Sequence, residues 1–451
     1  MNREQMRRVF LFPVRILGKI FSRITGIVIL PFSALAWTLQ LMLRFPQIAR
    51  SEVVVLMTSP TSFGPTVIGP DLVRRLYQGR RCLFFVASWR HEYNTKVSLL
   101  WTDVDVVFIP RFLITLSYRH RVIAVPLLLW HDRMVEWLTQ KLVGQVSGGR
   151  AQFLILLDLY RETQFLDQAT SSPSMQNGER ALSVDVTTQW QILQEQVPAP
   201  PARLPETMRS DIASGLERLW RKNNKGGTAK LCCMYLRIEK REVYRARLRN
   251  SSSLENHLLA VRLLNEAGYQ VLLTGDFEID AATREDFDGA LVDAKSLGAD
   301  NDIYRLFAVT EADIFIGNNG AGEVLAIINE IPSLYLDWFP YSNGRKNSWV
   351  YFKAARDKEN HMLSGRRLIT DFVYDSGASF GTLINNTQDE ITDAVACFIE
   401  DVKERNKTDP YADIAALIPM DTQFHATGAR LSPAWVRRNI PGEDVATKAQ
   451  A

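Results

Sequence analysis

The chain has 451 residues, a hydrophobic content of 46% and a formal net charge of +3 at pH 7. This length suits roughly two or three domains, and the composition is that of a folded globular protein, which excludes a disordered chain. The charge is too small, and the basic residues too dispersed, for an electrostatic nucleic-acid binder, so we predict no nucleic-acid partner. The cysteines lack metal or disulfide spacing, and we interpret them as thiols in a reducing compartment: Cys82, Cys232, Cys233 and Cys397.

Residues 1–48 are predicted to associate with a membrane. Arg8, Arg15, Lys19 and Arg23 fall on one helical face with apolar residues around them, a pattern typical of a basic amphipathic helix on an anionic membrane surface. Residues 25–43 carry no charge, and as a helix they would measure about 28 Å, just enough to span a bilayer. Three interpretations stay open: a monotopic or re-entrant anchor, a true span, and a buried helix. We expect the inner, cytoplasmic membrane, with the globular domains on its cytoplasmic side.

Residues 49–165 are predicted to form a first Rossmann-like domain. Apolar strands are expected at 53–57, 82–88, 104–110 and 152–157, with helices near 70–77 and 91–100. Strands that alternate with helices across short connections indicate a parallel sheet. Residues 166–228 are polar, then rich in proline, and they are predicted to be a linker region.

Residues 229–400 are predicted to form a second Rossmann-like domain. Strands are expected at 230–238, 269–275, 312–317 and 333–338, with helices at 254–267, 301–310 and 388–403. The last helix opens with Thr387 three positions before Glu390, which is a capping-box signature. Residues 401–451 are predicted to be a surface-wrapping or loose tail.

The stretch 314–337 carries the most information about function. An apolar strand runs into Asn318, Asn319, Gly320, Ala321 and Gly322 and directly on into a helix. Backbone N–H groups at a helix N-terminus bind anions, and glycines permit close approach, so we predict a phosphate or diphosphate site. The spacing is neither GxGxxG nor a P-loop, and an ordinary strand-to-helix turn is the alternative.

Basic residues follow the first strand of the second domain. Arg237 ends that strand, where a charge is costly without a partner. Tyr244, Arg249 and Asn250 follow in a basic loop, and Gly275 ends the next strand. Guanidinium groups fit phosphate oxygens, although a solvated basic loop is the alternative.

These residues resemble bacterial glycosyltransferases of GT-B type that are linked to surface-polysaccharide synthesis and are distantly similar to heptosyltransferases and O-fucosyltransferases. The resemblance covers roughly residues 205–400 and follows an ordered set of positions: Arg237, Tyr244, Arg249, Asn250, Gly268, Tyr269, Gly275, Asp302, Tyr304, the 318–322 loop, Pro332, Leu363 and Ser364. It implies an α/β, GT-B-like fold in which two doubly wound Rossmann-type domains face a cleft. It also implies an acceptor domain first and a nucleotide-sugar donor domain second.

The resemblance also implies roles for residues. The 318–322 loop and Arg237 would neutralise the leaving diphosphate, and Glu323 would accept ribose hydroxyls unless it only stabilises the helix N-terminus. His91, Asp71 and Asp158 are the candidates for a general base, because each lies near the end of a first-domain strand.

We expect transfer of a sugar from a nucleotide-sugar donor to a lipid-linked surface glycan, without a metal or other cofactor. Asp103-Val104-Asp105 matches the DxD metal motif, but it precedes its strand instead of following it. The alternatives are a nucleotide-sugar epimerase of the same fold and a catalytically silent scaffold in polysaccharide assembly.

Overall fold

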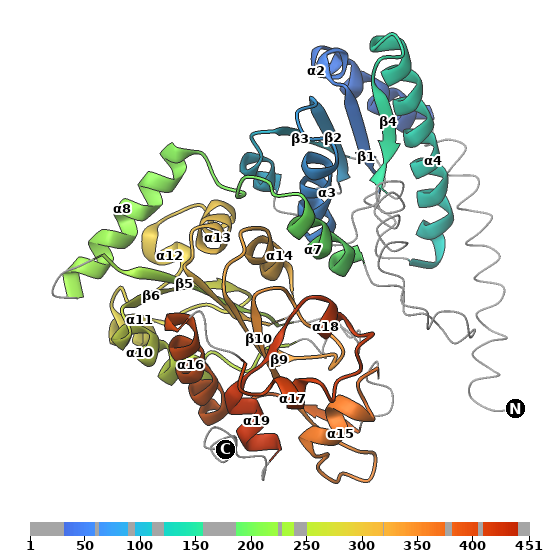
Figure 1. Ribbon diagram of the computed structural model, residues 1–451. Coiled ribbons are helices and arrows are strands. Elements are labelled where there is room, and N and C mark those ends of the chain that lie inside the picture. The colour runs from blue at the N-terminus through green and yellow to red at the C-terminus, as the bar shows by residue number, and fades with distance from the viewer. Residues whose placement is uncertain are drawn as a thin grey trace, which may run out of the picture. The chain divides into compact units, whose positions relative to one another are not determined.

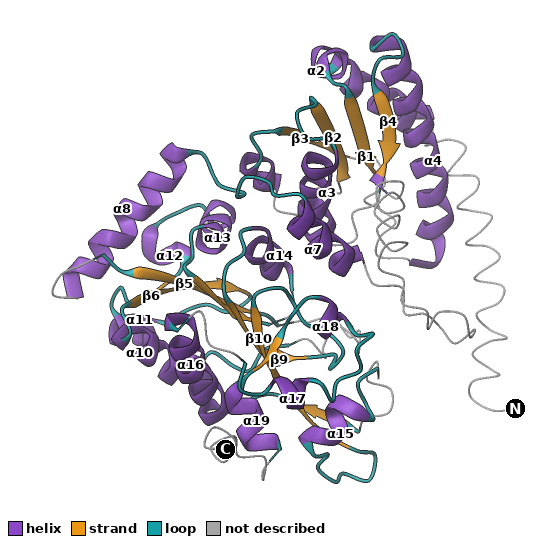
Figure 2. Cartoon of the chain, viewed as in Figure 1, coloured by secondary structure: helices purple, strands orange, loops and turns teal. Residues whose placement is uncertain are grey.

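The computed structural model describes residues 31–58, 63–88, 95–110, 121–156, 186–223, 228–238, 250–318, 320–374, 381–404 and 409–440. The chain divides into two compact units, Met1–Ser174 and Met175–Ala451. Each unit contains a parallel sheet with helices packed around it (Figures 1 and 2). The expected cleft concerns the placement of one unit against the other, and it stays a prediction.

The sheet of the first unit confirms the predicted parallel arrangement. Its strands are β1 (Val53–Met57), β2 (Cys82–Ser88), β3 (Val104–Pro110) and β4 (Gln152–Ile155). They are all parallel, in the order β3-β2-β1-β4. The chain builds outward from β1 to β3 and then returns to add β4 on the other side of β1. The strand order therefore reverses between β1 and β4.

Helices cover this sheet, and residues before position 49 belong to its core. The helices are a segment over 31–42, α2 (Phe45–Arg50), α3 (Phe63–Leu76), the 3-10 turn η1 (Thr95–Leu100) and α4 (Arg121–Val146). Trp37, Leu41 and Ile48 are buried together with residues of β1, β2 and α4. The described part of the predicted 1–48 segment is thus integral to the first unit. Among the described helices, none has the length and apolarity needed to cross a membrane.

The second unit has a larger parallel sheet. Its strands are β5 (Lys230–Leu236), β6 (Tyr269–Gly275), β7 (Leu291–Val292), β8 (Ile314–Gly317), β9 (Ser333–Trp338), β10 (Ser348–Phe352) and β13 (Arg430–Leu431). The order is β13-β10-β9-β8-β5-β6-β7, with every pairing parallel. The order reverses between β5 and β8. A separate antiparallel pair joins β11 (Ala354–Arg356) to β12 (Thr382–Ile384).

Helices lie on both faces of this sheet (Figure 1). One face carries α8 (Glu206–Asn223), α12 (Ala294–Leu297), α13 (Asn301–Thr310) and α14 (Ala321–Ile328). The other carries α10 (Leu258–Glu266), α11 (Ala281–Phe287), α16 (Gln388–Lys403) and α19 (Pro433–Asn439). The capping box of Thr387 and Glu390 is present at the start of α16, as predicted. This three-layer arrangement is the doubly wound fold expected for 229–400.

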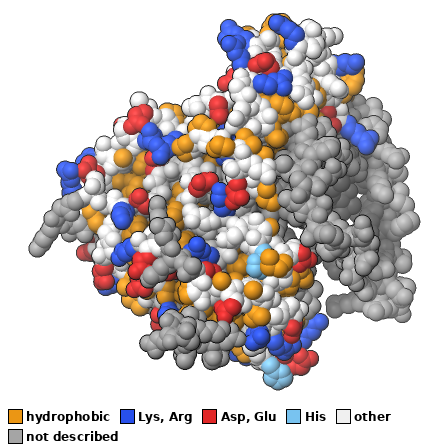
Figure 3. All heavy atoms as spheres, viewed as in Figure 1, with side chains coloured by type: hydrophobic (Ala, Val, Ile, Leu, Met, Phe, Trp, Pro, Cys, Tyr) orange, Lys and Arg blue, Asp and Glu red, His pale blue; other side chains and the backbone are white. Residues whose placement is uncertain are grey.

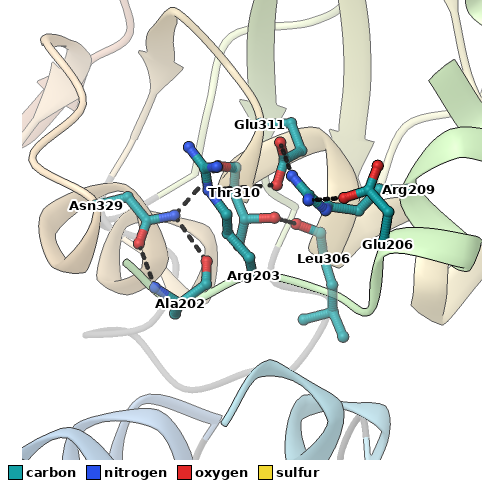
Figure 4. Close-up of polar contacts among 8 residues, drawn as sticks. All are labelled: Ala202, Arg203, Glu206, Arg209, Leu306, Thr310, Glu311 and Asn329. Atoms are coloured by element: carbon teal, nitrogen blue, oxygen red, sulfur yellow. Dashed lines mark hydrogen bonds and ion pairs between the residues drawn. The ribbon is translucent and has the colours of Figure 1, made fainter. Parts of the chain in front are cut away.

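The predicted linker region is not free over 186–223, because α7 (Val186–Gln196), α8 and the proline-rich stretch between them pack on the second unit. Asn329 fixes that stretch (Figure 4), since its side-chain amide accepts from Ala202 N and donates to Ala202 O, both at 2.9 Å. Arg209 of α8 bonds Glu206 and reaches Glu311 at 3.2 Å. Proline removes backbone donors, so side chains hold this segment where ladder hydrogen bonds cannot.

The predicted loose tail is also part of the second unit up to residue 440. β13 pairs with β10, and Phe424 and Trp435 are both fully buried. Trp435 packs edge-on against Phe352 of β10, with ring centroids 5.5 Å apart. Buried aromatic surface stabilises this segment, although its helices and its strand are short.

Candidate functional site

The two features predicted to bind a diphosphate meet where the strand order of the second unit reverses. β5 and β8 are neighbours, and Tyr235 of β5 pairs with Gly317 of β8. Arg237 therefore follows β5 at the same sheet edge at which Asn318 follows β8. In doubly wound sheets, ligands bind outside the carboxyl ends of the strands at this reversal point.

Gly275 holds the adjoining strand end in place. Its φ is +103°, and a Cβ at this position would lie 1.9 Å from the carbonyl oxygen of Leu236. Asp276 closes the turn, because its N–H donates to Leu236 O at 2.9 Å and its carboxylate accepts from Ile238 N at 3.0 Å. Glycine is thus required here by the backbone of β5 as well as by its own φ.

The glycines of the 318–322 loop are explained by Tyr235. A Cβ at Gly320 would lie 2.6 Å from the Tyr235 hydroxyl, and one at Gly322 would lie 2.9 Å from its ring. The close approach that the sequence suggested for a ligand is therefore made by a side chain of β5. Gly320 is also the N-cap of α14 and supplies no side-chain cap. The first-turn N–H groups of α14 are consequently not capped by residue 320.

Glu323 lies in the first turn of α14, but its carboxylate faces into the protein. It accepts from Arg345 at 3.2 Å, and the two residues are 5% and 4% exposed. The Arg345 guanidinium also lies over the Trp338 ring, 5.2 Å from its centroid. This burial contradicts the idea of a carboxylate open to ribose hydroxyls. The ion pair with Arg345 was not predicted from the sequence, and it gives the buried carboxylate a partner of opposite charge.

Asn250 is anchored beside the site by a buried network that the sequence did not reveal. Lys353 is 2% exposed, and its Nζ donates to the Asn250 carbonyl at 2.8 Å. Burial lowers the pKa of Lys353, while the Asp337 carboxylate opposes that shift. Asp337 in turn accepts from both the N–H and the hydroxyl of Ser252, at 2.6 and 2.9 Å. These contacts fix 250–252 at the carboxyl end of β9.

A hollow of about 760 Å³ opens beside β5 and β6. Ile238, Gly275, Asp276, Lys295 and Arg305 are among its lining residues. Arg305 donates to the Gly275 carbonyl at 2.7 Å and so belongs to both the strand end and the hollow. The volume is of the size that takes a nucleoside-sized ligand. Its described lining residues lie on the β6 side of β5, whereas Asn318 follows β8 on the other side of β5.

Asp71, one of the predicted candidate bases, lies inside the first unit. It is fully buried in α3, where one carboxylate oxygen bonds Arg74 at 2.7 Å and the other bonds Arg75 at 2.8 Å. A carboxylate with both oxygens committed to arginines has no position from which to reach an acceptor. By contrast, the Thr58 hydroxyl after β1 donates to Glu136 of α4 at 3.2 Å, which places an unpredicted carboxylate at the reversal point of the first unit.

Several predicted residues lie outside the described ranges: His91, Asp158, Tyr244, Arg249 and Asn319. Their roles stay predictions. Asp103 and Asp105 lie at the amino end of β3, as their order in the sequence indicated. Within the ranges that are described, no group of three or more metal-binding side chains comes together.

No protein-family model matches the chain, and no curated protein matches it. Solved structures do: a family 9 glycosyltransferase from Veillonella parvula matches with 10% identity and a TM-score of 0.41, over 78% of this chain and 98% of that one. ADP-heptose lipopolysaccharide heptosyltransferase II of E. coli matches with 13% identity and a TM-score of 0.35, over 67% of this chain and 90% of that one. The wall teichoic acid polymerase TagF matches with 10% identity and a TM-score of 0.32, over 96% of this chain and 98% of that one.

These structures include glycosyltransferases, the class of protein that the sequence resembles. Identities of 10% to 13% and TM-scores of 0.41 and below carry no conclusion about activity.

Proposed function

We propose that the chain is a glycosyltransferase of GT-B type that transfers a sugar from a nucleotide-sugar donor to a surface glycan. One observation carries this proposal: Arg237 and the 318–322 loop follow the two strands that flank the reversal point of the second sheet. A cation and a helix N-terminus at that point suit a diphosphate.

The proposed chemistry follows from charge. When the sugar leaves, negative charge develops on the diphosphate, and donors already fixed in place stabilise it without reorganisation. Arg237 and the N–H groups at the start of α14 would supply those donors. The hollow beside Gly275 and Arg305 would hold the nucleoside, on the β6 side of β5. No step of this scheme needs a metal.

The acceptor is proposed to be a lipid-linked glycan at the cytoplasmic face of the inner membrane. It would approach from the first unit, with His91 and Asp158 as the remaining predicted bases and Glu136 as a further carboxylate at the end of β1. A base there would take the proton of the attacking hydroxyl.

Calorimetry with nucleoside diphosphates tests the donor site. The full chain should bind at least one of ADP, CDP, GDP and UDP in buffer that contains EDTA. Arg237→Ala should weaken binding at least tenfold, about 1.4 kcal/mol. Arg367→Ala on α15 (Gly365–Thr370), an exposed arginine paired with Asp371, is the matched control and should bind normally. Binding of none of the four, or equal effects of both variants, would contradict the proposal.

Turnover separates the two alternatives. An epimerase would convert a free nucleotide sugar without an acceptor, whereas a scaffold would bind no nucleotide at the Arg237 site. The proposed transferase should move labelled sugar from the bound nucleotide class into the lipid extract of added membranes. Conversion in the absence of membranes would favour the epimerase.

A further inference from the structure

The helix over 31–42 has two opposite sides, and one is built into the first unit. Trp37 is 2% exposed, and its indole N–H donates to Thr139 of α4 at 3.0 Å. One turn earlier, Ser33 Oγ lies 2.8 Å from His131 Nε2. With Leu41, these residues recur every four positions, and they face α4 and the core.

The other side is apolar and exposed. The side chains concerned are Phe32 (62% exposed), Leu35 (59%), Leu39 (53%) and Met42 (57%). At about 100° per residue they share a face roughly opposite to Trp37. Leu43 and Phe45, at 80% and 51%, continue this surface into α2. We call these six residues the outer stripe. Ordinary surfaces carry single exposed apolar residues, whereas a contiguous set marks an interaction site.

Two further polar side chains of this helix, Thr38 and Gln40, hydrogen-bond to its own backbone. The Thr38 hydroxyl donates to Ala34 O at 2.8 Å, and the Gln40 amide donates to Ala36 O at 3.3 Å. No residue from 31 to 42 is charged. Hydrogen bonds of this kind lower the cost of placing hydroxyl and amide groups beside an apolar medium.

Charge next to the outer stripe indicates which medium this is. Arg44 and Arg50 are exposed at its end, and the chain that leads into the helix carries Arg8, Arg15, Lys19 and Arg23. Figure 3 shows basic side chains beside apolar ones at the upper edge of the drawn surface. Apolar side chains flanked by arginines complement acyl chains beneath anionic headgroups.

We propose that the outer stripe docks the first unit onto an anionic bilayer, with the helix over 31–42 lying in the plane of the interface. Its inner side stays in the protein core, so this segment enters the membrane by one face only. Of the three interpretations of the N-terminal segment, this is the monotopic anchor. The docking stands by itself, and only its use, access to a lipid-linked acceptor, rests on the proposed function.

Vesicle flotation of the full chain tests the docking. The probe is a vesicle of phosphatidylcholine that contains roughly 30% of the anionic lipid phosphatidylglycerol. Leu39→Glu/Met42→Glu should lower partition into these vesicles at least tenfold. Met362→Glu/Met420→Glu is the matched control, because those methionines are 56% and 74% exposed on the second unit. The control should float like the unmodified chain. High salt should weaken the binding of both to the vesicles.

Each outcome decides the proposal. Equal flotation of both variants overturns it. A melting temperature lowered by the outer-stripe variant alone also overturns it, since the stripe would then be covered by protein, for example by residues 1–30. Calorimetry with nucleoside diphosphates on the same samples keeps the two proposals apart: lost flotation with retained nucleotide binding supports docking, and flotation without nucleotide binding contradicts only the donor site.

Discussion

Gly275 shows how a single residue shapes the edge of the candidate site. Its positive φ and its contact with the Leu236 carbonyl are separate constraints. The first disfavours any residue with a Cβ, and the second would push β5 and β6 apart at the point where Arg237 begins. The requirement for glycine thus comes from the strand ends beside the candidate site, and it would hold without a ligand.

Substitution of Gly275 separates these constraints. Gly275→Ala should destabilise the chain by more than about 3 kcal/mol, because a backbone clash adds to the conformational cost. Gly298→Ala is the matched control: its φ is +62°, but nothing lies within 4 Å of the added Cβ, so it should lose about 1 to 2 kcal/mol. Urea unfolding measures both. Equal losses would show that the strand ends can separate freely.

The Glu323 carboxylate gives a second prediction at this scale. Glu323→Gln leaves the Arg345 guanidinium buried without its counter-charge, which should cost about 3 to 5 kcal/mol while nucleotide binding stays unchanged. Glu330→Gln is the control, because Glu330 pairs with Lys346 at an exposed position and should lose less than about 1 kcal/mol. A stable Glu323→Gln variant with weakened nucleotide binding would restore the ribose role.

The positions of some site residues could be predicted from the sequence, and those of others could not. Arg237 and Gly275 could be predicted because strand ends are visible as the end of an apolar run. Arg345 could not, since it lies in an irregular loop and meets Glu323 across 22 positions. Tyr235 was also missed as the partner of the glycine loop, because contact between neighbouring strands depends on sheet order.

At the scale of elements, buried polar groups link stability to pH. His257 ends the turn η4 (Glu255–His257), which packs against α16, and it is 1% exposed with Nδ1 2.8 Å from Ser253 O. Burial lowers the pKa of His257, while the Ser253 carbonyl and the Asp337 charge oppose that shift. The folded state therefore binds a proton at this residue less readily than the unfolded chain does.

The sign of the effect follows from this difference. Above the ordinary histidine pKa of about 6.5 both states are neutral here and the full stability is present; as the pH falls below it, the unfolded state takes the proton first and stability is lost. His257→Gln should reduce the slope of unfolding free energy between pH 7.5 and 5.5 by at most about 1.4 kcal/mol per pH unit. His361→Gln, at a 78% exposed side chain, controls for replacing a histidine. An unchanged slope would contradict the prediction.

Several elements were predicted well from their apolar patterns, and others were missed. β3, β6, β9, α13 and α16 lie where the apolar periodicity indicated. β10, β13 and α19 were missed, and their stability comes in part from partners far along the chain, such as Trp435 on Phe352. For the helix over 31–42 the sequence left three interpretations open, and the packing of Trp37 and Leu41 with residues of α4 places one side of this helix in the core of the first unit.

At the scale of the whole molecule, both sheets reverse their strand order next to their first strand. Alternating strands and helices predicted parallel sheets, but the order of strands could not be read from the sequence, because it depends on contacts between distant segments. The order is what brings Arg237 to the 318–322 loop. The proposed diphosphate site therefore depends on the topology, since the local motif alone is also compatible with an ordinary strand-to-helix turn.

Because each unit has its own sheet and core, we predict two unfolding transitions in scanning calorimetry of the full chain. A nucleoside diphosphate at a hundredfold excess over its Kd should raise the unfolding free energy of the second unit by about 2.7 kcal/mol. The transition temperature of the second unit alone should therefore rise. Trp37→Ala should lower the unfolding free energy of the first unit alone by about 3 to 5 kcal/mol, because it removes a buried indole and its hydrogen bond to Thr139. A single transition moved by both changes would mean that the units unfold together, so that the proposed donor site and the proposed membrane-docking helix would be coupled in stability.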